Sequence, residues 1–151
     1  MKKSERLAPL LKLEKNREQE QVKVLADARG KVAEQQQKLQ QLKDYRGEYE
    51  RMVSQEGAQG ISATRLQGYY QFLNRLSTAI TQQEEQLELV RQQENLAKNQ
   101  WFEQRGAVKR MDSLIKRNVQ QERLDEDKRE QKMLDEQAQQ MMNLRRANGL
   151  M

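Results

Sequence analysis

A long heptad repeat of apolar residues in the second half of the chain constrains the fold more than any other sequence feature. Alternate steps of three and four residues from Leu66 meet mostly apolar side chains as far as Ile115, over about eight heptads. A repeat this long predicts a coiled coil, because the apolar stripe of the helix has to be buried against a partner helix. The seam residues predicted on this helix are Leu73, Ile80, Leu87, Val90, Trp101, Val108 and Met111.

Polar residues interrupt this seam at four sites, Gln83, Glu94, Gln104 and Asn118. Polar side chains at core positions lower the stability of a coiled coil but can fix its register. They can equally mark places where no partner helix lies and the seam faces water. The sequence leaves both explanations open.

The first half of the chain carries a weaker seam of the same kind. Leu25, Val32 and Leu39 are spaced by seven residues, and the short step from Leu39 to Leu42 predicts a slip of the register there. Glutamine and lysine occupy several other core sites, so this helix alone would form only a weak coiled coil.

The helices are expected at residues 4–54 and 62–146. Residues 55–61, between them, contain two glycines that can end the first helix, and Ser62 can cap the second. A connection this short makes the helices antiparallel neighbours. The predicted fold is therefore all-α, an antiparallel coiled-coil hairpin that forms one domain over residues 1–151.

The second helix should extend well beyond the first. At 1.5 Å per residue it would be about 125 Å long, against about 75 Å for the first helix. Folding the chain about Ala58 places Ser4 near Ser113, so the second helix has no partner within the chain beyond that point. The remaining tail, residues 116–146, is charged and has only scattered apolar side chains. It is expected to form a C-terminal overhang.

Composition argues against a globular enzyme. Hydrophobic residues make up 35% of the chain and charged residues 34%, which is too little apolar surface for a compact core. The chain has no cysteine and no histidine, so thiolate metal sites and the commonest general base are missing. A two-helix rod also cannot enclose a substrate pocket. No catalytic residue, cofactor or metal is expected.

Charge and hydropathy also limit the partners. The formal net charge is +5, but acidic residues alternate with the basic ones, so no cationic stripe for nucleic acid stands out. No apolar run approaches the length of a membrane span, so direct membrane insertion is not expected. The chain is expected to be cytoplasmic, with any membrane association made through a partner.

One aromatic stretch, Tyr69–Leu73, stands out in a chain that has few aromatic residues. Phe72, Leu76, Ala79 and Gln83 follow one another at helical spacing and form a row beside the seam. A row at the edge of a thin rod is hard to bury against a single partner helix. It either widens the core or docks another protein, and the sequence favours neither.

These aromatic segments resemble the FliJ proteins of the bacterial flagellar type III export apparatus. The resemblance rests on Tyr45-Arg46-Gly47-Glu48-Tyr49, on Gly60-Ile61-Ser62, and on Tyr69-Tyr70-Gln71-Phe72-Leu73 followed by Leu76 and Ala79-Ile80. A weaker similarity lies within residues 128–140. Length and helix layout agree over nearly the whole chain.

The resemblance implies a non-enzymatic component of the export machine that looks like the central stalk of rotary ATPases. Its paired terminal helices would enter the hexameric ring of the export ATPase. The turn-proximal end would contact the cytoplasmic domain of the membrane export gate through Phe72, Leu76, Ala79 and Gln83. Family members also handle export chaperones. The implied location is the cytoplasm, at the inner face of the cell membrane.

Two alternatives remain open from the residues alone. The chain could be a generic scaffold that self-associates through its unpaired tail, or the equivalent stalk of a virulence secretion system. A stable dimer or tetramer would favour the scaffold, whereas an elongated monomer would favour the stalk.

Overall fold

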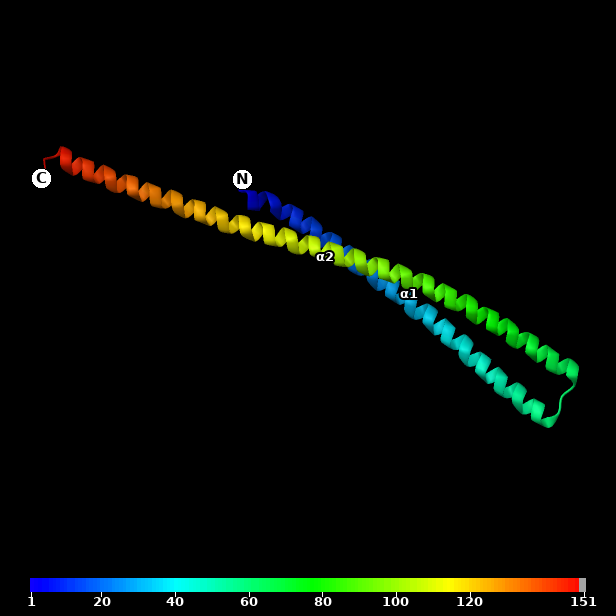
Figure 1. The fold of residues 1–151 in the computed structure, drawn as a ribbon. Helices are drawn as coiled ribbons and strands as arrows, with labels where there is room; N and C mark the ends of the chain where they lie inside the picture. The colour runs from blue at the N-terminus through cyan, green and yellow to red at the C-terminus, as the bar shows by residue number, and fades with distance from the viewer. Residues whose placement is uncertain (150–151) are drawn as a thin grey trace. The chain divides into compact units, whose positions relative to one another are not determined.

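The computed structural model describes residues 1–149, which form two α-helices and no β-strand. α1 covers Lys3–Gln59 and α2 covers Ala63–Ala147. The helices run antiparallel and pack against each other, and α2 continues past the start of α1 (Figure 1). The predicted all-α coiled-coil hairpin with a C-terminal overhang is confirmed.

The connection between the helices is shorter than predicted. α1 continues through Gly57, so residues 55–59, which were predicted as turn, are helical. Within the connection, Gly60 adopts the left-handed conformation, with a φ of 90°, and its N–H donates to the carbonyl of Gly57 at 3.2 Å. Because a Cβ is strained at this φ, Gly60 is the residue that ends α1. Ser62 caps α2 as predicted, since its hydroxyl accepts a hydrogen bond from the N–H of Arg65 at 3.2 Å.

Two compact units make up the chain, and each contains part of both helices. Unit 1 comprises Met1–Arg17 and Gln104–Met151, of which residues up to 149 are described. Unit 2 comprises Glu18–Glu103. The single domain predicted over residues 1–151 stays a prediction.

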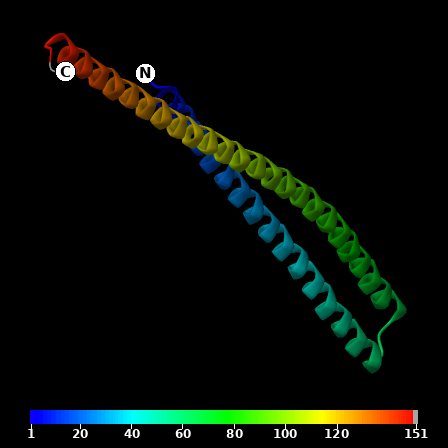
Figure 2. The same ribbon diagram turned by 60° about the vertical axis from the view of Figure 1, so that its left-hand side comes forward.

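The core of unit 2 is an apolar cluster between the helices. Its buried members are Leu39 of α1 and Ile80, Leu87 and Val90 of α2, with Val32 and Leu42 packed against them. Figure 2 shows the two helices of this unit side by side, joined by the short connection. The cluster combines both predicted seams, which places each apolar stripe against the other.

The ten residues predicted for the seam all lie on the inner side of the helices. Five of them are buried, namely Leu25, Leu39, Ile80, Leu87 and Val90. The other five are half-buried, namely Val32, Leu73, Trp101, Val108 and Met111.

The seam of α1 does not slip after Leu39. Leu42, Arg46, Tyr49 and Val53 continue the alternate steps of three and four residues, and each is buried or half-buried. The predicted slip is therefore wrong. The charge of Arg46 interrupts the apolar pattern at this point, but the helix keeps its register.

Two of the polar seam residues link the helices by hydrogen bonds. In unit 2, Nε2 of Gln83 donates to the backbone carbonyl of Gln35 at 3.0 Å and to its Oε1 at 2.6 Å. In unit 1, Gln104 makes the same two bonds to the backbone carbonyl and carboxylate of Glu14. The members of each pair are equally far from residue 59, by 24 residues in unit 2 and 45 in unit 1. These two side chains therefore bind a partner helix and fix the register.

Replacing Leu87 by alanine should destabilise the hairpin by about 2–4 kcal/mol, because its side chain is 4% exposed in the core of unit 2. Leu89→Ala is the matched control on the same helix, since Leu89 is 54% exposed. Urea unfolding followed by circular dichroism measures both variants. Equal losses of stability in the two would contradict the assigned register.

Candidate functional site

The four residues predicted to contact an export gate lie in unit 2, on the part of α2 that follows the connection. Leu76 is 8% exposed and belongs to the buried seam. Phe72, Ala79 and Gln83 are half-buried, and Gln83 is held by Gln35. The row therefore lies against α1 along one edge, and Phe72 and Ala79 supply most of its accessible apolar surface.

Phe72 packs into an aromatic cluster that crosses from α2 to α1. Its ring centroid lies 4.6 Å from that of Tyr49 and 6.1 Å from that of Tyr45, the latter in an edge-to-face arrangement. Tyr49 also meets Tyr69 edge to face at 5.7 Å. Such arrangements are the favoured ones for aromatic pairs. The cluster widens the core near the connection and leaves the outer edge of Phe72 accessible.

The accessible apolar surface continues onto α1, where Tyr45 and Met52, which the predicted slip would place in the seam, are exposed. Tyr45 contacts Phe72 and is 50% exposed, and Met52 is 38% exposed. The two are seven residues apart, so they share one side of α1. We call Tyr45, Met52, Phe72 and Ala79 the turn-end apolar surface. Tyr45 directly precedes the seam residue Arg46, and Met52 directly precedes the seam residue Val53. This repeat of seven residues was the signal in the sequence that could have placed both side chains beside the seam.

Hydrogen bonds across the connection hold this surface in place. The hydroxyl of Tyr69 donates to the carboxylate of Glu56 in a short hydrogen bond, and Nε of Arg65 donates to the Tyr69 oxygen at 2.9 Å. Arg65 also pairs with Glu56 at 3.5 Å. The hydrogen bond to Glu56 raises the pKa of Tyr69, so its hydroxyl keeps its proton at physiological pH. The last turn of α1 is thereby tied to the first turns of α2.

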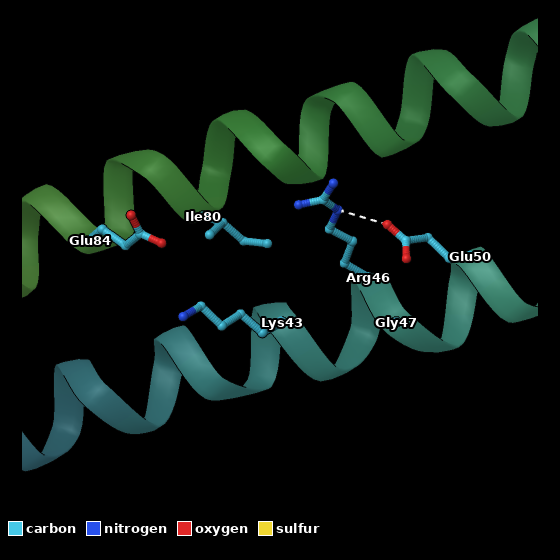
Figure 3. Close-up of a pocket in the computed structure, with 6 residues that line it drawn as sticks. All are labelled: Lys43, Arg46, Gly47, Glu50, Ile80 and Glu84. Atoms are coloured by element: carbon cyan, nitrogen blue, oxygen red, sulfur yellow. Dashed lines mark ion pairs between the residues drawn. The ribbon is translucent and has the colours of Figure 1, made fainter.

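The other side of the same helix pair is charged. A depression of about 310 Å³ lies in unit 2. Figure 3 shows the residues that line it, with Ile80 between the helices and charged side chains from both helices around it. Lys43 and Glu84 face it from opposite helices, and Nε of Arg46 pairs with Glu50 at 3.1 Å. The charges are mixed in sign and open to water, so this depression offers no enclosed site for chemistry.

In unit 1 a carboxylate of α2 caps the N-terminus of α1. Oε1 of Glu122 accepts a hydrogen bond from the N–H of Ser4 at 3.0 Å, and Oε2 accepts one from its hydroxyl at 2.7 Å. Ser4 is 8% exposed. A negative charge is favoured at this position because a helix N-terminus carries unpaired N–H groups and a partial positive charge. The two hydrogen bonds from Ser4 lower the pKa of Glu122.

Beyond Glu122, α2 has no partner among residues 1–149. Every described residue from 123 to 149 is exposed, and the helix continues to Ala147. Polar side chains support it locally, for example Gln121 with Asp125 and Gln131 with Asp135, each at 3.1 Å. The overhang predicted for residues 116–146 thus begins seven residues later, at residue 123, because contacts with α1 reach Glu122.

Removing the charge of Glu122 should loosen the start of α1. In Glu122→Gln, amide hydrogen exchange of the first turns of α1 should accelerate, because the carboxylate that accepts both Ser4 hydrogen bonds is gone. A carboxyl whose pKa is lowered by folding stabilises the folded state above its unfolded pKa and loses that effect as the pH falls. The exchange rates of wild type and variant should therefore converge in acid.

Glu126→Gln, in the exposed overhang, is the control for this variant. Unchanged exchange at the start of α1 in Glu122→Gln at neutral pH would contradict the capping role.

Two kinds of site are missing from the described residues. None of the carboxylates in residues 1–149 gather into a group that could hold a metal ion. Neither α1 nor α2 contains a stretch apolar enough to cross a bilayer.

Comparison with known proteins identifies relatives over most of the chain. The family model described as flagellar FliJ protein matches residues 2–147. The flagellar FliJ protein of Escherichia coli (strain K12) is 30% identical over 133 residues, which cover 88% of this chain and 90% of that protein. The flagellar FliJ protein of Salmonella typhi is 30% identical over 117 residues, which cover 78% and 80%. No solved structure gives a significant match.

Proposed function

Because the chain belongs to the FliJ family and is a component of flagellar protein export, we propose that it couples two machines without catalysing a reaction. Its terminal unit binds the hexameric ring of the export ATPase. Its turn-proximal unit binds the cytoplasmic domain of the membrane export gate. The observation that supports this proposal is that the two units carry chemically different surfaces.

The gate contact is supported by the turn-end apolar surface. Tyr45 and Phe72 present adjoining aromatic edges from two helices that are tied together at the connection. Partly exposed aromatic and methionine side chains on a rigid support are typical of protein-binding surfaces. Leu76 supports this surface from within, and Gln83 fixes its register.

The ATPase contact is supported by the composition of unit 1. Its helix pair ends at the contact between Ser4 and Glu122, and a single charged helix continues beyond it. Such a surface mixes charged and glutamine side chains with scattered exposed apolar ones, so it can make many weak contacts in a ring without being held in one position. Family resemblance, and not geometry, supplies the identity of this partner.

Two further roles follow from the same proposal. Export chaperones bind the chain as additional partners. The gate contact keeps the chain at the inner face of the cell membrane while it remains in the cytoplasm. Family membership favours the flagellar assignment over a virulence-type stalk or a generic scaffold.

The gate contact can be tested at residues of the turn-end apolar surface that lie outside the buried seam. Tyr45→Glu and Ala79→Glu should each weaken binding of the purified gate domain by about ten-fold or more, because each buries a charge in an apolar interface. Stimulation of the ATPase should persist in both variants. Leu89→Glu, at an exposed site of the same unit, is the control. Unchanged gate affinity in both variants would exclude the turn-end apolar surface as the contact.

The ATPase contact has a separate test. The wild-type protein at micromolar concentration should raise the turnover of the export ATPase and the fraction that is hexameric. No change in either quantity would exclude the stalk function, whatever the gate result.

A further inference from the structure

The overhang of α2 carries an apolar strip that no other part of the described chain covers. Leu134, Met141 and Leu144 are 60%, 61% and 63% exposed. They follow one another by seven and three residues, so they lie along one face of the helix. A shallow recess of about 220 Å³ beside Leu134 is lined by Glu130, Met133 and Gln137. We call Leu134, Met141 and Leu144 the tail strip.

The tail strip lies on the opposite face of α2 from the seam. The seven sites that continue the seam beyond Glu122 are all polar, namely Asp125, Arg129, Lys132, Glu136, Gln139, Asn143 and Arg146. Leu134 lies midway between Lys132 and Glu136, and two residues correspond to about 200° of rotation around a helix. A partner of the tail strip therefore approaches from the side that faces away from α1. It can bind without displacing α1.

Charge is distributed unevenly along the overhang. Residues 125–136 carry six acidic and three basic side chains, whereas residues 137–149 carry two basic and no acidic ones. The first half is thus negative and the second half positive. Consider a helix with the same uneven charge that pairs with this segment in the antiparallel direction. Its positive half would lie against the negative half of the overhang, and its negative half against the positive half.

We propose that this helix is the overhang of a second copy of the chain. Two overhangs paired antiparallel about a two-fold axis between Gln137 and Ala138 place Leu134 opposite Met141 of the second copy. The same alignment places Glu130 opposite Arg145 of the second copy. Every such contact occurs twice, as a two-fold interface requires. The recess beside Leu134 then receives the flexible Met141 side chain, which adapts well to irregular spaces.

This pairing gives the free protein a way to cover its tail strip. Any other partner that binds the strip has to compete with the second copy. The interface is small, so the dimer should be weak, with a Kd on the order of 10–100 µM, and monomer and dimer should exchange freely. It differs in this respect from a permanent scaffold.

Sedimentation of the full-length protein over a range of concentrations tests the proposal. Wild type should shift from monomer to dimer across the micromolar range, and added salt should weaken the dimer. Leu134→Glu with Met141→Glu should remain monomeric. Leu89→Glu with Leu96→Glu is the matched control, since these residues are 54% and 59% exposed on the same helix outside the overhang. A wild type that stays monomeric to millimolar concentration, or a control that is equally monomeric, would overturn the proposal.

The direction of pairing can be tested separately because the chain has no cysteine of its own. Glu130→Cys mixed with Arg145→Cys should form a disulfide-linked heterodimer faster than either variant links to itself. Faster self-linking of each variant would show parallel pairing and overturn the antiparallel arrangement. Both experiments use the chain alone, so their failure would leave the proposed ATPase and gate contacts unaffected.

Discussion

Packing along the seam between α1 and α2 has to supply almost all of the apolar burial in this protein. Only eight hydrophobic residues of the described chain are buried, and none is completely enclosed. A helix pair has no second layer to compensate for a poor fit, so each core side chain matters more than it would in a globular domain. Long helices of strong helix-forming residues reduce the amount of apolar burial that folding requires, because the backbone hydrogen bonds are satisfied within each helix.

The polar residues of the seam make this thin core specific. An apolar seam alone tolerates shifts by one heptad, since leucine can replace leucine at the next site. Gln83 and Gln104 do not tolerate such a shift, because each amide is bound to the backbone carbonyl of one residue on α1. The contact of Glu122 with Ser4 adds a third fixed point at the start of α1. The polar residues lower the stability of the coiled coil at these sites, but they allow only one alignment of α1 with α2.

Much of this architecture could be predicted from the sequence, and the parts that could not have physical causes. The seam of α2 was evident because its apolar residues recur over many heptads. The seam of α1 was misjudged at Leu39–Leu42, because Arg46 fills the next core site with a charged side chain. The connection was predicted too long, because a glycine permits a turn without requiring one, and Gly57 stays helical. The role of Phe72 depended on ring packing with Tyr45 and Tyr49, which spacing along one helix does not reveal.

The symmetric hydrogen bonds on either side of residue 59 have a consequence for how such a chain can evolve. A residue inserted into α1 between Glu14 and Gln35 would turn one part of its seam by about 100° relative to the other and separate one of the two pairs from its partner. The insertion would have to be whole heptads, matched by an equal insertion between Gln83 and Gln104 of α2. The overhang lies beyond the last contact with α1, so a change in its length leaves both hydrogen-bonded pairs of the hairpin in place. The reach of the tail can therefore change without altering the hairpin that carries it.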